Sequence, residues 1–578
     1  MATTVAEQLI EVLHAAGVRR IYGLVGDSLN PIADAVRRHP DFDWVHTHNE
    51  EGAAFAASAE AQVTGRLAVC AGSCGPGNTH LIQGLYDAHR SGAPVLALAS
   101  HIPSDQIGTG YFQETHPERV FADCSHFTEM VNGAAQMPRL LRIAMQTAVG
   151  KHGVSVLVVP GDVGARPVAH ETGTSPLAYR TPVEEPAAED VRELAELINR
   201  AESVALFAGA GVRDARAEVL ELAATVNAPM GHSLGGKEWI QYDNPYDVGM
   251  SGLLGYGACY EATQEADLLL LLGTDFPYDS FLPGRRTVQI DRDAARLGRR
   301  TPLELGVTGD VGATLRAVLP LLERRTDRTF LDKMLRRHAK ALENVVSAYT
   351  KDITKLRPIH PEYVAAQLDE LAGADTIFTV DTGMCNVWAA RYLTPGPGRR
   401  VLGSFRHGSM ANALPMAIGA QTAAPGRQVV SLSGDGGLSM LLGELLTVRE
   451  QNLPLKVVVF NNGSLGMIRL EMMVAGYPFY ETDHGPADYA AIAAACGLQS
   501  VAVDDPAQVR PALERALASP GPFLVDVRTD PNALSLPPHI TGEQVRGFAL
   551  ASTRTVLHGG VGRMLELARS NLRNIPRP

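Results

Sequence analysis

Two short polar motifs, 24 residues apart, could together bind a metal ion late in the chain. Gly434-Asp435-Gly436 follows one apolar run, and Asn461-Asn462 follows the next. If both runs are parallel strands joined by one helix, their polar side chains lie at the same edge of a sheet. Oxygen ligands at that edge suit Mg²⁺, which also takes oxygens from a bound diphosphate. Each motif alone is a common loop sequence, so the interpretation depends on their spacing.

Glu50 is a second residue that could do chemistry, because it lies where a strand over residues 44–48 turns into an alanine-rich helix. A carboxyl group at such a junction could hold or move a proton on a bound ligand. The alternative is that Glu50 or Glu51 only stabilises the helix amino terminus, where acidic side chains are favoured. Position alone favours this alternative.

The elements around these residues predict an α/β fold with three doubly wound parallel sheets, because short apolar runs alternate with helical segments. The first block has strand candidates at residues 20–26, 44–48, 67–70, 94–100 and 154–160. The middle block has candidates at 203–208, 267–272 and 287–290, and the third at 376–380, 428–432 and 455–460, with one helix expected over 438–451. The predicted domains are 1–182, 183–335 and 336–531, followed by a tail over 532–578.

The composition is that of a soluble multidomain chain, with 578 residues, 63 acidic and 51 basic side chains and 45% hydrophobic residues. This apolar content excludes wholesale disorder, and the net charge of −12 argues against a nucleic-acid partner. We expect no signal peptide, and no run approaches the roughly 20 apolar residues of a membrane span. The six cysteines show no metal or disulfide spacing, and His46 and His48 are interpreted as structural residues rather than ligands.

The GDG and NN spacing, with Gly408-Ser409-Met410 ahead of it, resembles the thiamine-diphosphate enzymes of the pyruvate oxidase and acetolactate synthase group. The resemblance implies that Asp435, Asn462 and the carbonyl oxygen of Ser464 hold Mg²⁺, and that Glu50 is the catalytic carboxyl group. Gly408, Ser409 and Met410 would hold the aminopyrimidine ring of the cofactor. The other implied contacts in these loops are Gly436, Gly437, Gly463, Leu465, Gly466, Met467 and Ile468.

The middle block has Gly209-Ala210-Gly211 after a strand, a match too short to indicate a nucleotide site by itself. The resemblance nevertheless implies bound FAD. Its implied contacts are Ser251, Gly252, Leu253, Leu254, Thr274, Asp275, Phe276, Pro277, Tyr278 and Asp291. Phe112 and Gln113 would line the substrate pocket as catalytic residues. Met467 is also included among the catalytic residues, because one subgroup of the family carries an aromatic residue linked to activation at this position. This chain has Asn49 where many members carry His before the catalytic Glu.

The resemblance covers nearly the whole chain and extends to the quinone-linked pyruvate dehydrogenases of bacteria. It implies oxidative decarboxylation of pyruvate to acetate and CO₂, with electrons passing through FAD to a membrane quinone. The alternatives are a phosphate- and oxygen-dependent pyruvate oxidase, an acetolactate synthase-type carboligase, and a member that binds cofactors without catalysis. Because Glu50 and Asp435 lie in different blocks, the resemblance implies a site shared by two subunits, hence a homodimer at minimum, with a tetramer expected.

The tail has its own charge pattern, with six arginines and two glutamates from Thr541 onward, a local balance of +4. Apolar residues recur there at helical spacing, at Met564, Leu565, Ala568 and Leu572. This pattern is typical of a helix that lies on a lipid surface, but a surface helix packed on its own domain fits equally. The resemblance favours the lipid surface. We therefore expect a cytoplasmic protein that associates peripherally with the inner face of the cell membrane.

Overall fold

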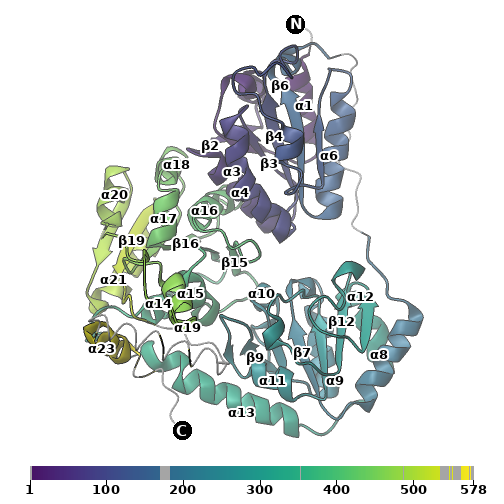
Figure 1. Cartoon of the computed structure of the whole chain (residues 1–578), viewed down its shortest axis with the longest axis vertical. Coiled ribbons are helices and arrows are strands. Elements are labelled where there is room, and N and C mark those ends of the chain that lie inside the picture. The colour runs from purple at the N-terminus through teal and green to yellow at the C-terminus, as the bar shows by residue number, and fades with distance from the viewer. Residues whose placement is uncertain are drawn as a thin grey trace.

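The computed structural model describes residues 3–168, 182–351, 353–485, 487–533, 561–571 and 573, with two isolated residues, 546 and 550. The described chain forms three α/β units, each built around its own sheet (Figure 1). In that view the amino-terminal unit lies at the top, the central unit at the lower right and the carboxy-terminal unit at the left. The fold class predicted from the sequence is confirmed, whereas the exact domain bounds stay predictions.

The amino-terminal sheet has six parallel strands in the order β2-β1-β3-β4-β6-β5. They are β1 (Arg20–Gly23), β2 (Asp43–His46), β3 (Ala68–Gly72), β4 (Val95–His101), β5 (Phe127–Met130) and β6 (Val154–Pro160). One face is covered by α1 (Val5–Ala15), α2 (Asn30–Arg38) and α6 (Met137–Lys151), the other by α3 (Glu50–Thr64) and α4 (Pro76–Ser91). Every residue of β3 and β4 is buried, because helices cover both faces of the sheet. Two short helices complete the unit, α5 (Pro117–Val120) and α7 (Gly161–Ala165).

The carboxy-terminal sheet repeats this strand order, as β15-β14-β16-β17-β19-β18, and all its neighbours are parallel. Its strands are β14 (Ile377–Val380), β15 (Arg400–Gly403), β16 (Val429–Gly434), β17 (Lys456–Asn461), β18 (Gln499–Val503) and β19 (Phe523–Arg528). Its helices are α14 (Pro361–Leu371), α15 (Met384–Tyr392), α16 (Ala413–Ala423), α17 (Asp435–Met440), α18 (Glu444–Glu450), α19 (Gly466–Val474), α20 (Tyr489–Ala495) and α21 (Pro506–Ala518). The two outer units are thus built on one topology.

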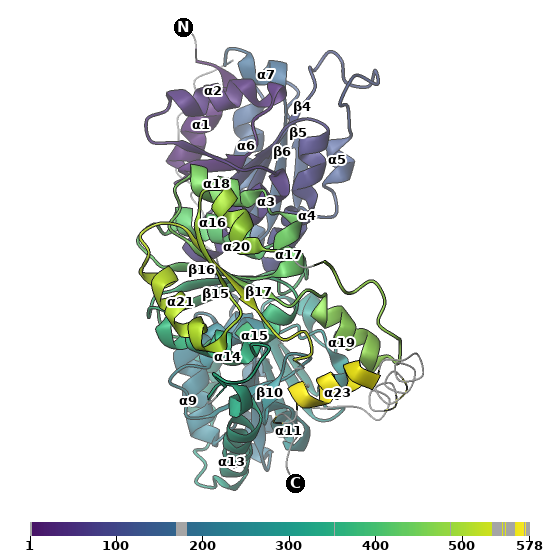
Figure 2. The same ribbon diagram turned by 90° about the vertical axis from the view of Figure 1, so that its left-hand side faces the viewer.

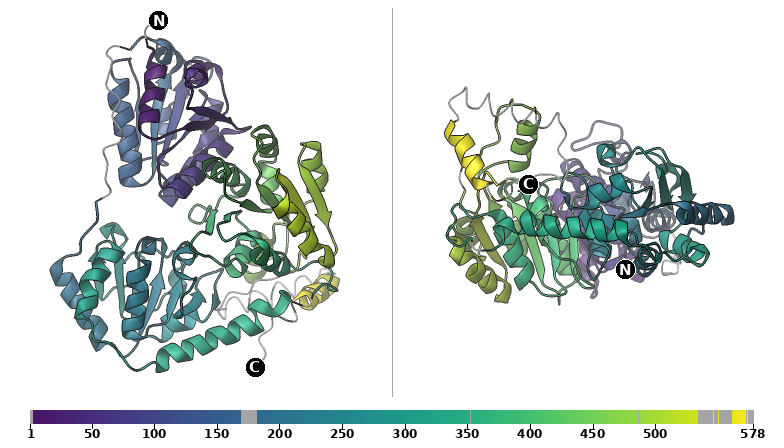
Figure 3. Two further views of the ribbon diagram at one scale, coloured as in Figure 1. Left: turned by 180° about the vertical axis from the view of Figure 1, so that it is seen from behind. Right: turned by 90° about the horizontal axis from the view of Figure 1, so that it is seen from below.

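The central unit has a seven-stranded sheet in the order β10-β9-β8-β7-β11-β12-β13, parallel except for the β9–β10 pair. Its strands are β7 (Val204–Ala208), β8 (Met230–His232), β9 (Asp247–Met250), β10 (Tyr256–Gly257), β11 (Leu268–Leu272), β12 (Thr287–Asp291) and β13 (Leu305–Thr308). Its helices are α8 (Ala188–Arg200), α9 (Arg216–Val226), α10 (Leu234–Ile240), α11 (Cys259–Glu265) and α12 (Val311–Val318). The long helix α13 (Thr329–Asn344) runs from this unit toward the carboxy-terminal unit, as Figure 3 shows from behind.

The single helix predicted over residues 438–451 is wrong, because this stretch forms α17 and α18 with a break between them. The chain leaves the helical conformation at Leu441, where φ is −122° and ψ is 39°. Gly443 then precedes the second helix. The break places Glu444 at the first position of a new helix, where its side chain can reach a neighbouring domain.

The outer units pack against each other through α3 and α16, which lie side by side (Figure 2). Residues of both helices belong to one continuous hydrophobic cluster. The two backbones approach closely because their contact surfaces carry small residues. A Cβ atom on Gly419 would overlap the carbonyl oxygen of Ala56. Sequence composition, here an alanine-rich helix opposite a glycine, therefore sets the relative position of the two units.

The tail is described only in part, and residues 534–545 and 551–560 lie outside the described residues, as do the side chains of Met564 and Leu572. Within the described part, α23 (Val561–Ser570) lies against the carboxy-terminal unit. Leu567 is buried against Met473, whereas Leu565 is 55% exposed. Among the helices of the described residues, none is long and apolar enough to span a membrane.

We expect the Gly419→Ala substitution to lower the unfolding temperature, because the added methyl group must force α3 and α16 apart. Overpacking of this kind costs about 1–3 kcal/mol. Differential scanning calorimetry of the purified chain measures the change. Gly426→Ala is the matched control, because a Cβ atom there would meet nothing within 4 Å. Equal unfolding temperatures for both variants would contradict the close α3–α16 approach.

Candidate active site

The structure brings together the two polar motifs of the carboxy-terminal unit. Asp435 begins α17 directly after β16, and Asn462 follows β17, the neighbouring strand. The Oδ2 atom of Asp435 accepts a hydrogen bond of 2.6 Å from the backbone N–H of Gly463, and its Oδ1 atom accepts one of 2.9 Å from Gly436. The Oδ1 atom of Asn462 accepts a hydrogen bond of 3.0 Å from the N–H of Ser464. The carboxylate and the amide oxygen therefore lie on touching loops.

A cavity of about 250 Å³ opens beside these loops. Its lining includes Gly436 and Leu465 from the two motifs and Met410 from the segment between β15 and α16. The remaining lining residues are Ser439, Met440, Glu481, Thr482, Asp483 and His484. All of these described lining residues belong to the carboxy-terminal unit, so the cavity has an open side toward which another surface could close.

The residues of the two loops beside this cavity fit a magnesium-bound diphosphate. Asp435 and Asn462 offer side-chain oxygens, and Ser464 offers a backbone oxygen, which are the hard ligands that Mg²⁺ takes. Next to Gly437, the Oδ2 atom of Asp381 is buried without a hydrogen-bond partner among the described residues. A Cβ atom on Gly437 would overlap this carboxyl group. Only glycine at position 437 therefore lets the backbone pass so close to Asp381. Burial raises the pKa of Asp381 to about 7.

Two residues that the sequence analysis missed contact the Asp435 position. The Nε2 atom of His484 lies 3.2 Å from the Oδ2 atom of Asp435. The hydroxyl group of Tyr489 donates a hydrogen bond of 2.8 Å to the Asp435 carbonyl oxygen. Both residues come from the segment before and within α20, which carries no motif. No local signal could have identified them, because only the fold brings this segment to the cavity.

The Gly408–Met410 segment lies where the two outer units meet. Gly408 has a φ of +76°, a conformation that favours glycine. The N–H of Ser409 donates to the Ser404 hydroxyl at 2.9 Å, and Gln83 of α4 donates to the Ser409 hydroxyl at 2.9 Å. These bonds fix the segment from both sides, while Met410 reaches the cavity.

Glu50 is the first residue of α3 and is 4% exposed. Asn49 caps this helix, since its side-chain oxygen accepts the N–H of Glu51 at 2.8 Å. The Oε2 atom of Glu50 lies 2.9 Å from Nδ1 of His80 on α4. Its Oε1 atom lies so close to Gly77 that a Cβ atom there would approach to 2.8 Å. A buried carboxyl group thus faces the turn that begins α4.

Gln113 lies on the other side of the same turn. Its φ is +63°, uncommon for a residue other than glycine. Its Oε1 atom accepts a hydrogen bond of 3.3 Å from the Cys74 thiol. The neighbouring Phe112 is 79% exposed on the surface of this chain. The structure therefore places Glu50 and Gln113 beside the Cys74–Gly77 turn, with Phe112 exposed next to Gln113 in the chain. None of the three lines the cavity beside Asp435.

Glu444 joins the two outer units directly at the Glu50 junction, and the sequence analysis missed it. Its Oε1 atom accepts the backbone N–H of His48 at 3.1 Å and that of Asn49 at 3.0 Å. Its Oε2 atom accepts the hydroxyl group of Thr447 at 2.7 Å. Burial raises the pKa of Glu444 to about 7. A residue nine positions after Asp435 thus fixes the backbone that leads into Glu50.

The remaining predicted residues of the metal loops surround the start of α19. Ser464 is 4% exposed, whereas Ile468 is 41% exposed. Gly463 has a φ of +65°, and Gly466 begins the helix. Met467 is half-buried and packs against the apolar core of the carboxy-terminal unit.

The predicted flavin contacts gather at the carboxyl edge of the central sheet. The Ser251–Leu254 segment forms the turn between β9 and β10, Thr274 to Tyr278 follow β11, and Asp291 ends β12. The Ser251 hydroxyl is buried without a hydrogen-bond partner among the described residues, and Asp291 is 4% exposed, with a pKa raised by burial. A buried hydroxyl and a buried carboxylate at such an edge fit the polar groups of a dinucleotide.

The other residues of this group are held by the central unit itself. Phe276 is buried and packs edge-on against Phe207 at 5.0 Å between ring centroids. Asp275 forms ion pairs with Arg299 at 3.0 Å and Arg300 at 3.3 Å. The exposed members are Leu253, Pro277 and Tyr278. Gly252 has a φ of +100° within the turn, and Leu254 packs against the carboxy-terminal unit.

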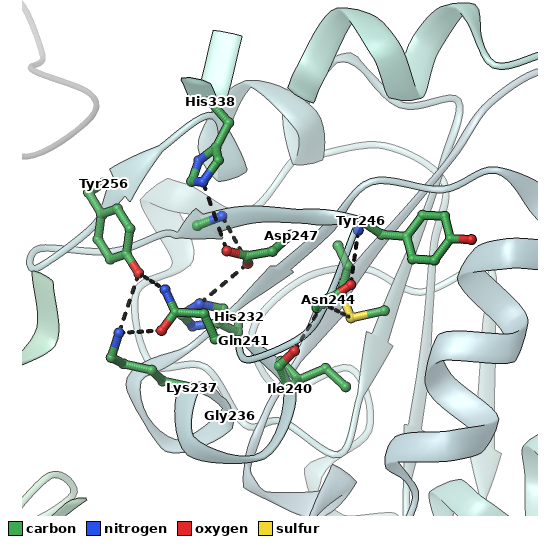
Figure 4. A network of polar contacts seen from close by, with 12 residues as sticks. His232, Gly236, Lys237, Ile240, Gln241, Asn244, Tyr246, Asp247, Tyr256 and His338 are labelled. Carbon is green, nitrogen blue, oxygen red and sulfur yellow. Dashed lines mark hydrogen bonds and ion pairs between the residues drawn. The ribbon is translucent and has the colours of Figure 1, made fainter. Parts of the chain in front are cut away.

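A buried polar network holds both ends of the turn that carries Ser251 (Figure 4). The ammonium group of Lys237 donates to Gln241 and lies 3.4 Å from the Tyr256 hydroxyl. At the other end, Asp247 lies 3.7 Å from Nε2 of His232. Burial lowers the pKa of Lys237 to about 8 and raises that of Asp247 to about 6. The network fixes β9 and β10, and hence the position of residues 251–254.

The order of these sites along the chain matches one family. The model of the thiamine pyrophosphate enzyme N-terminal TPP binding domain matches residues 3–120. The central-domain model of the same enzymes matches residues 191–318, and the C-terminal TPP binding domain matches residues 381–527. The chain belongs to the thiamine pyrophosphate enzymes.

Three relatives match nearly the whole chain. The YdaP protein of Bacillus subtilis, named as a candidate thiamine pyrophosphate-containing protein, is 37% identical over 94% of this chain and 95% of its own length. The pyruvate oxidase of Lactiplantibacillus plantarum is 31% identical over 90% of this chain and 87% of that oxidase. The large subunit of acetolactate synthase isozyme 1 of Escherichia coli is 29% identical over 91% of this chain and 94% of that subunit. Identity alone does not separate these two activities.

We expect the stability of the chain to depend on Lys237 in alkaline solution. Because its pKa falls from 10.5 to about 8 on folding, the unfolded chain holds one more proton than the folded chain between these pH values. The free energy of unfolding therefore rises with pH across this window. Between pH 8 and pH 10, the free energy of unfolding of the wild type should rise by about 1–3 kcal/mol more than that of Lys237→Met.

Chemical unfolding of both variants at several pH values measures this difference. Lys340→Met removes an exposed lysine from α13 and is the matched control. A difference between wild type and Lys237→Met that stays constant across the window would contradict the lowered pKa.

Proposed function

We propose that this protein oxidatively decarboxylates pyruvate to acetate and CO₂, with thiamine diphosphate, Mg²⁺ and FAD as cofactors and a membrane quinone as electron acceptor. The observation that carries the proposal is the contact between Asp435 and the N–H of Gly463 beside the cavity of about 250 Å³. Relatives named as pyruvate oxidase and acetolactate synthase support a small 2-keto acid as the substrate.

In this proposal, Asp435, Asn462 and the carbonyl oxygen of Ser464 hold Mg²⁺ against the cofactor diphosphate. Gly408, Ser409 and Met410 hold its aminopyrimidine ring, and Met410 is suited to this because it reaches the cavity. The bound cofactor supplies a carbon nucleophile and an electron sink for decarboxylation. The protein supplies orientation and a carboxyl group, Glu50, that holds a proton at the pyrimidine ring.

The site is completed by a second copy of the chain. The described residues that line the cavity all come from the carboxy-terminal unit, whereas Glu50, Phe112 and Gln113 gather at the amino-terminal unit. A partner subunit would bring its amino-terminal edge over the open side of the cavity. Phe112, 79% exposed in one chain, would then be covered beside the substrate. This arrangement needs at least a homodimer, and two such dimers would form the tetramer.

The flavin would lie at the carboxyl edge of the central sheet, with Asp291 and the Ser251–Leu254 turn as its polar and backbone contacts. Its role is to accept two electrons and pass them on. For the quinone, the support comes from the tail. Helix α19 begins directly after Ser464 and Leu465, and its Met473 contacts Leu567 of α23. A lipid surface that binds the exposed Leu565 would therefore act on a helix connected to the metal loop.

Two other activities of the same family remain as alternatives. A phosphate- and oxygen-dependent pyruvate oxidase would use the same residues with a different electron acceptor. An acetolactate synthase-type carboligase would bind FAD without net oxidation of the substrate. The buried Glu50 and the complete set of metal oxygens favour an active enzyme over a scaffold.

The first experiment follows the flavin absorbance of the reconstituted enzyme under anaerobic pyruvate. We expect the oxidised flavin band to bleach, because electrons from the decarboxylated substrate have no other acceptor. A quinone analogue should restore the band faster than oxygen with phosphate does. Formation of acetolactate without bleaching would instead assign a carboligase, and faster recovery with oxygen and phosphate would assign the other oxidase.

The second experiment compares Glu50→Gln with Glu51→Gln. Glutamine cannot hold the proton at the pyrimidine ring, so we expect pyruvate decarboxylation to fall by roughly 10²–10⁴-fold in Glu50→Gln, with thiamine diphosphate binding retained. Glu51→Gln changes the adjacent glutamate of the same helix and should keep nearly full activity. Turnover of Glu50→Gln at the level of the control would remove Glu50 from this role. Steady-state CO₂ release and cofactor titration measure both properties.

A further inference from the structure

Three potential metal ligands converge where the two outer units meet, away from the Asp435 loops. His46 ends β2, and His48 lies two residues further along the chain. Glu450 is the last residue of α18 in the carboxy-terminal unit. One ligand atom from each of these three side chains lies within 4.8 Å of the other two. We propose that His46, His48 and Glu450 bind one zinc ion.

The spacing along the chain explains why the two histidines face the same way. Alternate residues of an extended segment point to the same side, so His46 and His48 lie next to each other. Their ring centroids are 5.3 Å apart, in an edge-to-face arrangement. The Nε2 atom of His48 lies 3.8 Å from the Oε1 atom of Glu450. The amino-terminal unit supplies two ligands, one at the end of β2 and one just after it, and the carboxy-terminal unit supplies the third.

The separations suit a metal after small side-chain rotations. Ligands about 2.0–2.1 Å from a tetrahedral zinc ion lie about 3.4 Å from one another. The present separations are therefore wider by less than about 1.5 Å. The side chain of Glu450 is 47% exposed and that of His48 is 28% exposed, so both can move without disturbing the core.

A hydrogen bond favours the tautomer of His48 that zinc binding needs. When Glu444 is ionised, Thr447 donates its hydroxyl proton to it at 2.7 Å, and the hydroxyl oxygen accepts from Nδ1 of His48 at 2.9 Å. In this tautomer the proton is on Nδ1 and the lone pair is on Nε2, the atom that faces Glu450. Metal-binding histidines are held in this way by a hydrogen bond at the second ring nitrogen.

The donor set distinguishes this site from the magnesium site. Two imidazoles and one carboxylate form a common zinc set, which leaves the fourth position to water. Mg²⁺ prefers oxygen ligands and should not compete here. A bound zinc ion would connect α18 to the segment between β2 and α3. It would do so at His48, two residues before Glu50. It would strengthen the contact that Glu444 already makes between the two units. This inference does not depend on the reaction catalysed.

The test uses the full-length protein, stripped of metals and then saturated with Mg²⁺ and thiamine diphosphate. Zinc chloride is added, and zinc retained after gel filtration is measured by atomic spectroscopy. We expect one zinc ion per chain and a higher unfolding temperature than without zinc. In His46→Ala, His48→Ala and Glu450→Gln the dissociation constant should rise roughly tenfold or more.

His39→Ala is the matched control, because His39 also lies beside a second histidine, His14, and 3.7 Å from Glu11, outside the converging group. It should bind zinc like the wild type. Glu450→Gln changes an exposed side chain and so decides the case if a histidine variant fails to fold. Zinc that is retained only when Mg²⁺ and the cofactor are left out would belong to the Asp435 loops and would overturn the proposal. So would unchanged affinity in Glu450→Gln, or no retained zinc.

Discussion

The organisation of this chain depends on one buried carboxylate, that of Glu444, which accepts two backbone N–H groups from another domain. These donors belong to His48 and Asn49, at the point where β2 has ended and α3 is about to begin. A buried N–H group without an acceptor costs about 1–3 kcal/mol, so this contact stabilises the domain packing and the local backbone together. Because α18 follows α17 closely, the same short stretch carries Asp435 and holds the segment that leads into Glu50. A single interaction thus helps to position both regions of the chain that carry candidate site residues.

The repeated strand order of the outer sheets gives this interaction its geometry. Each sheet presents its chemistry at the carboxyl ends of its strands, with Glu50 after β2 and Asp435 after β16. In both units the residues beyond these strands are fixed by close backbone approach, as at Gly77 beside Glu50 and Gly437 beside Asp381. In the proposed dimer, the edge that carries carboxylate and carbonyl oxygens would face the edge that carries the buried acid of the second copy. The carboxyl edge of the central sheet would hold the proposed flavin in the same way.

Local pattern was sufficient for several of the strands that are buried on both sides. β3, β4, β16 and β17 are mostly apolar, and the sequence identifies them with only small errors at their ends. It missed the buried strand β19, whose apolar run is interrupted by Asp526. It also missed β18, an edge strand whose residues are mostly half-buried or exposed, because polar side chains interrupt its pattern. The GDG and NN motifs were recognisable because their spacing reflects a strand–helix–strand unit. Glu444, by contrast, bonds to residues 395 and 396 positions away, and His46 and His48 acquire Glu450 only through the fold. Contacts between residues so far apart in the chain produce no recognisable local sequence pattern.

Helix α3 is enclosed by glycine on two sides, since Gly84 of α4 meets Ala54 and Gly419 of α16 meets Ala56. Close backbone packing of this kind opposes sliding or tilting of the helix. It therefore favours a fixed relative position of the two outer domains of one chain. If the proposed function is correct, entry of a keto acid and exit of its product would fall to the largely exposed loops, the one over residues 106–114 and the one over 475–484. The packed helix pair would then be the fixed frame against which these loops open.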